Sequence, residues 1–328
     1  MEYVQAATGL VPSSALGVTM MHEHVLCDQR LCRSMRNKNL PWGTYMWFDN
    51  MDEMTEELHE YRKSGGDAMV EVTCHGWGRD PEGLREMSLR TGVHFIVSTG
   101  LYVEDCHPGW VESKSVDQLA SWFQREITVG CNAKESDRIT PVKAGVIKVS
   151  CSRQSFEGNE LKCLRAAGIA QSRTGAAITS HNSASVRFEI PEGNVGMQML
   201  EVLEDEGVSP ERVIVGHVDE NVDIRNLEAL ANKGAYVQLD TIGKQHYLLD
   251  TTRADLVKAA KNRGFLDHVL LGQDRNRKPE LKKYGGPGYS DILDRFTTLL
   301  SERGLSRQEI ETILVLNPAR VLSTSRRG

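Results

Sequence analysis

The pattern of hydrophobic and polar positions divides the chain into short apolar runs and longer segments of helical character. Eight runs are rich in Val, Ile and Leu: Gly17–His24, Asp67–Thr73, Val93–Thr99, Ala144–Val149, Ala176–His181, Arg212–His217, Ala235–Leu239 and His268–Gly272. Most are continuously apolar, which is typical of parallel strands buried on both faces. The pattern therefore predicts eight parallel strands.

The segments between these runs predict helices. They are Met51–Ser64, Pro81–Thr91, Val116–Val129, Asn159–Thr174, Val195–Glu206, Val222–Lys233 and Thr251–Arg263, with Tyr289–Arg303 and Ser306–Leu314 after the last run. An α/β chain that alternates strand and helix eight times predicts a (β/α)8 TIM barrel, with residues 1–328 forming one domain. An open doubly wound sheet would need a Gly-rich turn after its first strand, where this chain has His22-Glu23-His24 instead.

Composition excludes several classes of protein. The chain has 328 residues, a net charge of -6 and no basic tract, so nothing favours a nucleic-acid partner. No apolar run is long enough to span a membrane, and the first residues lack the features of a secretory signal. Seven scattered cysteines without CxxC spacing favour free thiols. We therefore expect a soluble, cytoplasmic enzyme that acts on a small-molecule substrate.

Polar residues gather where the predicted strands end. His22 and His24 end the first run, Lys148 lies in the fourth, His181 and His217 end the fifth and sixth, and Asp274 follows the eighth. Each alone has an ordinary explanation as a satisfied histidine, a paired lysine or a helix cap. In a barrel, however, the carboxyl ends of all strands meet at the rim that carries catalysis. Imidazole and carboxylate groups converging there predict a metal centre.

The spacing of the first pair supports this prediction. Side chains alternate across a strand, so His22 and His24 face the same side and can hold one cation, while Glu23 faces the barrel wall or a helix.

Lys148 is unusual because burial and a nearby cation both lower the pKa of an amine. A neutral amine can react with carbon dioxide to form a carbamate, an anionic ligand that can bridge two metals. A lysine paired with a carboxylate is the alternative.

The ordered set of HxH, Lys, His, His and Asp resembles that of the amidohydrolase superfamily. More narrowly, the chain resembles the phosphotriesterase family, which includes lactonases and phosphotriesterase-related proteins. The similar segments are GVTMMHEHV, AGVIKVS, ITSHN, VIVGHVDE, LLGQD and NPARVL, so the resemblance covers residues 15–322. As an ordered set, these motifs are specific.

The resemblance implies a binuclear centre of two divalent metal ions, commonly zinc, with manganese or cobalt as alternatives. His22, His24 and Asp274 would bind the more buried metal, and His181 and His217 the more exposed one. Lys148, carboxylated by carbon dioxide, would bridge the two metals together with a hydroxide. The hydroxide would attack the substrate while Asp274 moves the proton, which makes Asp274 and Lys148 the catalytic residues. The family also suggests a homodimer.

The loops after the seventh and eighth strands bear on the substrate. Their sequences, DTIGKQHY and DRNRKPELKKYGGPGY, are polar and basic and resemble the lactonase branch. In that branch, positions matching Lys244 and Arg275 hold an anionic group, and Tyr102 and Tyr284 are further candidates for contact with the substrate. An ordinary surface charge is the alternative for both cations. The Arg-Asn-Arg after Asp274 departs from many members, which have an aromatic or small apolar residue there.

These features predict a metal-dependent hydrolase that opens a polar, anionic lactone of a sugar or phosphosugar. An amidase acting on N-acyl amino acids, a carboxylesterase and a phosphotriesterase could use the same centre. A non-catalytic binding protein is the remote alternative, and the loss of a ligand would indicate it. All six ligand positions are filled.

Overall fold

The computed structural model describes residues 2–35, 47–153, 155–182, 195–220 and 222–325. Eight parallel strands form one sheet in the order β12-β11-β10-β9-β8-β7-β6-β3. They are β3 (Thr19–Glu23), β6 (Ala68–Glu71), β7 (His94–Gly100), β8 (Val146–Cys151), β9 (Ala177–Asn182), β10 (Val213–Val215), β11 (Tyr236–Leu239) and β12 (Val269–Leu271). The first and last strands of this order, β12 and β3, lie next to each other and close the barrel. The amide of Asp274, just after β12, donates to the carbonyl of His22 in β3 at 2.9 Å. The predicted TIM barrel and all eight predicted strands are confirmed.

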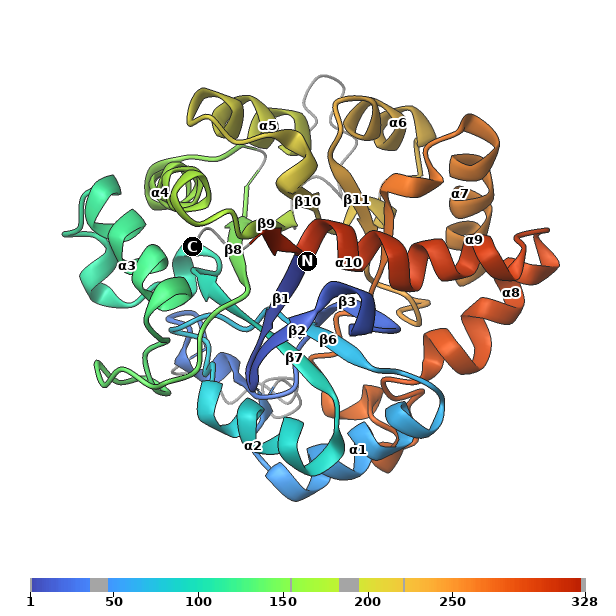
Figure 1. Cartoon of the computed structure of the whole chain (residues 1–328), viewed down its shortest axis with the longest axis horizontal. Coiled ribbons are helices and arrows are strands. Elements are labelled where there is room, and N and C mark those ends of the chain that lie inside the picture. The colour runs from blue at the N-terminus through green and yellow to red at the C-terminus, as the bar shows by residue number, and fades with distance from the viewer. Residues whose placement is uncertain (1, 36–46, 154, 183–194, 221, 326–328) are drawn as a thin grey trace.

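Helices surround this barrel (Figure 1). They are α1 (Met51–Lys63), α2 (Pro81–Thr91), α3 (Val116–Thr128), α4 (Gly158–Thr174), α5 (Val195–Asp205), α6 (Ile224–Asn232) and α7 (Asp250–Arg263). The last two predicted helices each contain a π-helical turn, Ile292–Phe296 before α8 (Thr297–Glu302) and Thr312–Leu316 between α9 (Arg307–Glu311) and α10 (Asn317–Leu322). Caps explain several boundaries, such as Asp80, whose carboxylate accepts from Gly83 N at the start of α2.

A small antiparallel sheet at the amino-terminal end of the barrel was not predicted. It consists of β1 (Glu2–Ala6), β2 (Gly9–Pro12) and β13 (Thr324–Ser325). The Ala7 amide donates to the carbonyl of Phe95 at 2.7 Å, which joins the segment after β1 to β7. A further unpredicted pair, β4 (Cys27–Asp28) and β5 (Trp47–Phe48), lies in the connection between β3 and α1. These strands are too short to leave a clear periodic pattern.

The barrel interior is apolar toward its amino-terminal end. One buried cluster joins Val4 of β1 and Val321 of α10 to inward residues of the strands, among them Met21, Ile96 and Leu270. A second and larger cluster fills the space between the strands and the helices. Because the amino-terminal end is packed with apolar groups, the polar side chains are collected at the carboxyl ends of the strands.

The expectation of free thiols is wrong for two of the seven cysteines. Cys32 and Cys106 form a disulfide across 74 residues of sequence. The loop after β3 and the loop after β7 lie side by side at the same rim, a proximity that sequence spacing does not reveal. Cys27, Cys74, Cys131, Cys151 and Cys163 are buried and are not joined in disulfides. Among the described residues, no helix combines the length and apolar character needed to cross a membrane.

Candidate metal centre

The carboxyl ends of five strands bring the six predicted ligand residues together. His22 and His24 direct their Nε2 atoms toward Asp274 Oδ1, at 3.9 Å and 3.2 Å. Lys148 Nζ lies 3.1 Å from His22 Nε2. His217 Nε2 lies 2.6 Å from His181 Nδ1. The potential ligand atoms therefore converge in two groups, with Lys148 beside the first of them.

Two of these residues adopt a backbone conformation that side chains disfavour. Among the described non-glycine residues, only Glu135, His217 and Asp274 have positive φ, at 45°, 57° and 50°. His217 follows β10 and Asp274 follows β12, so the chain turns left-handed at both points. Such strain is found at functional sites, where the surrounding structure holds it in place. Here it aims the imidazole and the carboxylate back over the barrel mouth.

Asp240, which follows β11, is a residue of this site that the sequence analysis missed. Its Oδ1 lies 2.6 Å from His217 Nδ1 and its Oδ2 lies 2.8 Å from His22 Nδ1. One fully buried carboxylate thus contacts a histidine from each of the two groups and leaves both Nε2 atoms free for metal. An acidic residue directly after the seventh apolar run was the available signal, equivalent to Asp274 after the eighth.

Burial keeps most of the predicted ligands in the state that metals require. It lowers the pKa of His22 to about 3 and lowers the pKa values of His24 and His181, so these imidazoles are neutral. It also lowers the pKa of Lys148 to about 8, which brings the neutral amine within reach near physiological pH. His217 is the exception: burial opposes its charge, but Asp240 raises its pKa to about 9.

The donor set fits divalent metals. His22, His24 and Asp274 offer ligand atoms that all lie within 4.8 Å of one another, and all three residues are buried. Imidazole nitrogen with carboxylate oxygen suits zinc and related divalent ions. His181 and His217, whose Nδ1 and Nε2 atoms lie 2.6 Å apart, would hold a second ion.

Lys244 lies beside this centre. It is 3% exposed, and its Nζ is 2.6 Å from Asp274 Oδ2 and 4.0 Å from Glu280 Oε1. Although burial opposes ionisation of Asp274, Lys244 holds the pKa of that carboxyl well below its usual range. The Asn276 amide also approaches both oxygens of Asp274, at 3.4 Å. The structure thus places a buried ammonium group next to a predicted metal ligand.

Arg275 takes a different position from the one the sequence suggested. Its guanidinium is 1% exposed and donates to Gln273 Oε1 and Asp291 Oδ2, both at 3.1 Å, and to Gly288 O at 3.3 Å. These bonds hold the loop after β12 against the chain that leads into α8. We therefore assign Arg275 to the architecture of this loop and not to contact with a substrate.

Of the two tyrosine candidates, one lies at the centre and the other lies away from it. Tyr102 lies 3.2 Å from His181 Nε2 through its hydroxyl and stacks on Trp77 with ring centroids 4.4 Å apart. Trp77 in turn meets the ring of His24 edge-on at 4.4 Å. Tyr102 therefore belongs to the wall of the site. Tyr284 is 46% exposed and donates to Glu53 of α1, so it lies on the outside of the loop.

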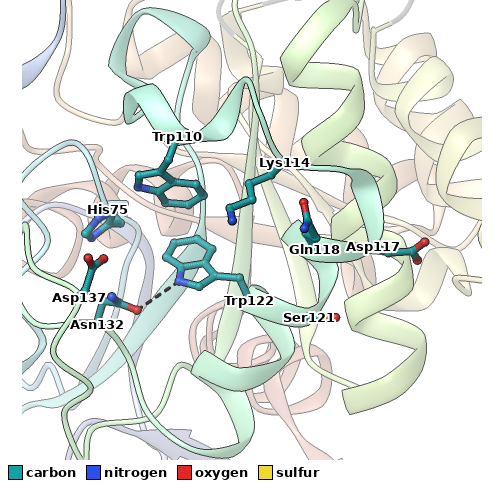
Figure 2. A pocket seen from close by; sticks show the side chains of 9 residues that line it. All are labelled: His75, Trp110, Lys114, Asp117, Gln118, Ser121, Trp122, Asn132 and Asp137. Carbon is teal, nitrogen blue, oxygen red and sulfur yellow. Dashed lines mark hydrogen bonds between the residues drawn. The ribbon is translucent and has the colours of Figure 1, made fainter.

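A cavity of about 630 Å³ lies beside α3 and includes none of the six predicted ligands (Figure 2). His75, Trp110 and Trp122 form its aromatic side, and Asn132 accepts a hydrogen bond from the indole of Trp122 at 3.1 Å. His75, which directly follows Cys74 after β6, therefore faces this flank and is not a member of the ligand cluster. The cavity and the candidate metal centre are separate features.

Comparison with known proteins agrees with this geometry. The sequence model of the phosphotriesterase family matches residues 2–322. The phosphotriesterase homology protein of Escherichia coli is 31% identical, over 92% of this chain and 97% of that protein. Its crystal structure, with phosphate in the active site, superposes with a TM-score of 0.83 over 94% of this chain and 99% of that chain.

A second group of relatives carries a named activity. The human N-acetyltaurine hydrolase is 30% identical, over 98% of this chain and 97% of that protein. A lactonase from Listeria monocytogenes superposes with a TM-score of 0.86, over 99% of this chain and 100% of that chain, but at 24% identity it shows the fold alone. The eight-stranded barrel, the ligand order and these matches agree, and the chain belongs to the phosphotriesterase family of hydrolytic enzymes.

Proposed function

We propose that this protein is a binuclear metal-dependent hydrolase that opens a polar lactone carrying an anionic group. The observation that carries the proposal is the convergence of the six predicted ligands at one rim, with a buried cation, Lys244, against one of them. Divalent metals at such a site supply an acidified water as the nucleophile and polarise the oxygen of the substrate's carbonyl group.

The chain's own residues have separable roles. Asp240 contacts the Nδ1 atoms of His22 and His217, which fixes both rings with Nε2 toward the centre. Asp274 lies where it can take the proton of the attacking water and pass it to the leaving oxygen. Lys148, which lies 3.1 Å from His22 Nε2, would as a carbamate supply an anionic ligand. Tyr102 and Trp77 stack on one another and line the side near His181 and His24.

Lys244 is the residue that we propose recognises the anion. Arg275 pairs with Asp291 and does not face the centre. Of the two cations expected to bind the anionic group, only the ammonium group of Lys244 therefore lies beside Asp274. A point charge suits a small carboxylate, sulfonate or phosphate without selecting its geometry. The phosphate in the active site of the Escherichia coli relative also supports an anion near this centre.

An amide substrate is the second candidate. It is favoured by the human relative, whose name describes hydrolysis of an N-acetylated amino sulfonic acid and whose similarity extends over 98% of this chain. An N-acyl amino acid or sulfonate places its anion a few bonds from the scissile carbonyl, as an anionic lactone does. The same Lys244 would serve both substrates.

Kinetics on a matched panel test the proposal. We would measure kcat/KM of the zinc-, manganese- and cobalt-loaded protein on anionic sugar lactones, neutral lactones of the same ring, N-acyl amino acids and aryl phosphotriesters. We expect anionic lactones to be preferred, activity to vanish on chelation and Lys148→Ala to lose nearly all of it. Full activity after exhaustive chelation would contradict the proposal. A preference for the amides would select the second candidate.

The role of Lys244 is tested by the ratio of kcat/KM for the anionic lactone to kcat/KM for the neutral lactone. In Lys244→Met, the preference for the anionic over the neutral lactone should fall by about 10- to 100-fold, which is the usual value of one hydrogen bond to a charged group. Lys283→Met is the control: it removes the same charge from the neighbouring loop after β12, where Lys283 pairs with Glu53 and is 46% exposed. An unchanged ratio in Lys244→Met would remove Lys244 from anion recognition.

A further inference from the structure

The second ring nitrogen of His24 has a buried partner that the family's ligand pattern does not include. His24 Nδ1 lies 2.8 Å from Thr73 Oγ1, and Thr73 Oγ1 lies 2.6 Å from Glu71 Oε1. His24 is 2% exposed, and Thr73 and Glu71 are fully buried. Glu71 ends β6 and Thr73 follows it two residues later, so the three side chains form a short chain of contacts from the neighbouring strand to the metal centre.

The direction of these hydrogen bonds follows from which groups can only donate. Glu71 Oε1 accepts from the amide of Val25 at 3.1 Å, and Glu71 Oε2 accepts from the amide of Thr73 at 3.3 Å. Backbone N–H groups never accept, so each oxygen of Glu71 accepts one amide hydrogen bond, and the ionised carboxylate has no proton to donate to Thr73. The hydroxyl of Thr73 has one proton and gives it to Glu71. Its lone pairs are then left for His24, whose Nδ1 must be the donor.

We propose that Thr73 and Glu71 are positioning residues that hold His24 with its proton on Nδ1, so that the lone pair of Nε2 faces the metal shared with His22 and Asp274. The inference rests on the proposed metal centre but not on the identity of the substrate. It assigns to the buried metal two orienting groups from different strands: Asp240 after β11 for His22, and the pair from β6 for His24.

The packing around His24 leaves its ring little alternative. Trp77 contacts the ring edge-on with centroids 4.4 Å apart. The amide of Val72, between Glu71 and Thr73, donates to the carbonyl of Glu23 at 3.0 Å, which fixes β6 against β3 next to His24. Rotating the ring would place a C–H group against Thr73 and lose the hydrogen bond. The hydroxyl of Thr73 therefore selects both the tautomer and the orientation of the ring.

Metal binding, measured without substrate, tests the inference. Thr73→Val keeps the shape of the side chain and removes the hydroxyl. We expect zinc affinity, measured by competition with a fluorescent chelator, to fall by about 10- to 100-fold at one of two sites, the usual effect of losing an orienting partner. Elemental analysis at limiting free zinc should then find one equivalent in Thr73→Val and two in the wild type. Thr73→Ser, which keeps the hydroxyl, should bind both metals as the wild type does.

Thr19→Val is the matched control. Thr19 is fully buried on the same strand as His22, and its hydroxyl donates one hydrogen bond, to Gly17 O at 3.0 Å, at the opposite end of the barrel. It should lose some stability and no metal. If Thr73→Val does not fold by circular dichroism, Thr73→Ala gives the same readout without added bulk.

The outcomes separate this inference from the proposed function. Wild-type zinc affinity at both sites in Thr73→Val or Thr73→Ala would overturn the positioning role. Equal weakening in Thr73→Ser and Thr73→Val would also overturn it, because packing and not the hydroxyl would be responsible. A protein that binds two metals, loses one selectively in Thr73→Val and yet hydrolyses nothing in the panel would refute only the proposed function.

Discussion

At the scale of single residues, metal binding at the candidate centre depends on the protonation states of its histidines. Burial lowers the pKa values of three of the four predicted ligand histidines, so they meet a metal as neutral imidazoles. His217 differs because Asp240 raises its pKa to about 9 despite burial. A proton must therefore leave His217 before a metal can bind there.

This difference predicts a pH dependence. Because the pKa of His217 in the folded protein lies above its ordinary value of 6.5, its proton stabilises the metal-free protein fully below about pH 6.5, and this contribution is lost as pH rises to about 9. Zinc affinity at one of the two sites should correspondingly rise about tenfold per pH unit toward pH 9 and then level off. Calorimetric titrations from pH 6.5 to 9.5 measure the slope.

Asp240→Asn provides the contrast for this prediction. It removes the negative charge that raises the pKa of His217, so the slope between pH 7 and 9 should flatten. Asp255→Asn, a change at an exposed aspartate paired with Arg303, is the control and should leave the slope as in the wild type. A slope equally steep in Asp240→Asn would show that the proton released on metal binding does not come from His217.

At the scale of elements, the loops that carry the site are held by buried ion pairs. Arg79, just before α2, donates to both oxygens of Glu126 in α3 at 2.7 Å and 2.6 Å, and both residues are fully buried. Glu126 also accepts from Thr99 at 2.6 Å and from the amide of Asn132 at 2.8 Å. One carboxylate thus connects the loop after β6, the end of β7 and the segment after α3.

Removing this carboxylate should affect stability and spare metal binding. We expect Glu126→Ala to lower the free energy of unfolding by about 3–5 kcal/mol, because it leaves the buried charge of Arg79 without its ionic partner. Urea unfolding measures this loss, and zinc stoichiometry should stay at two. Glu82→Ala breaks the exposed pair with Arg138 and should cost no more than about 1 kcal/mol. Similar losses in the two variants would contradict the burial argument.

At the scale of the whole molecule, the barrel brings distant segments to one rim. The disulfide between Cys32 and Cys106 is an example, since it joins the loops after β3 and β7. Its sulfur atoms lie in a cluster with Trp77, against which Tyr102 packs, so it supports the aromatic wall of the site. It also removes two cysteines from the seven that the sequence analysis expected to be free thiols.

The disulfide can be tested by counting thiols. The unfolded, unreduced protein should expose five free thiols to a thiol reagent, and seven after reduction. The double variant Cys32→Ser with Cys106→Ser should lose up to about 4 kcal/mol of unfolding free energy, given the length of the loop that the bond closes. Seven thiols without reduction would show that the bond does not form in solution.

Much of the architecture was predictable because it depends on local patterns. Pro81–Thr91 was predicted at both ends, since Asp80 and Gly92 provide the cap and the left-handed turn. The convergence of the six predicted ligand residues at one rim was predictable because the carboxyl ends of the strands meet in a barrel. Asp240 and the pair Glu71 and Thr73 were not predicted, because their roles depend on which ring nitrogen they face. The contacts of Arg275 were not predictable either, because its sequence position does not reveal that Asp291 lies within reach of its guanidinium group.

The sequence by itself determined the barrel, the order of its strands and the set of residues available to hold metal. Both the hydrophobic periodicity and the residue types at the strand ends are properties of neighbouring positions in the sequence. Only the tertiary structure decided which nitrogen of each histidine faces the centre, which of two basic loop residues lies beside Asp274 and which cysteines meet. These depend on contacts between distant segments, such as that of Gln273 N with Glu23, 250 residues apart, and no local pattern encodes them.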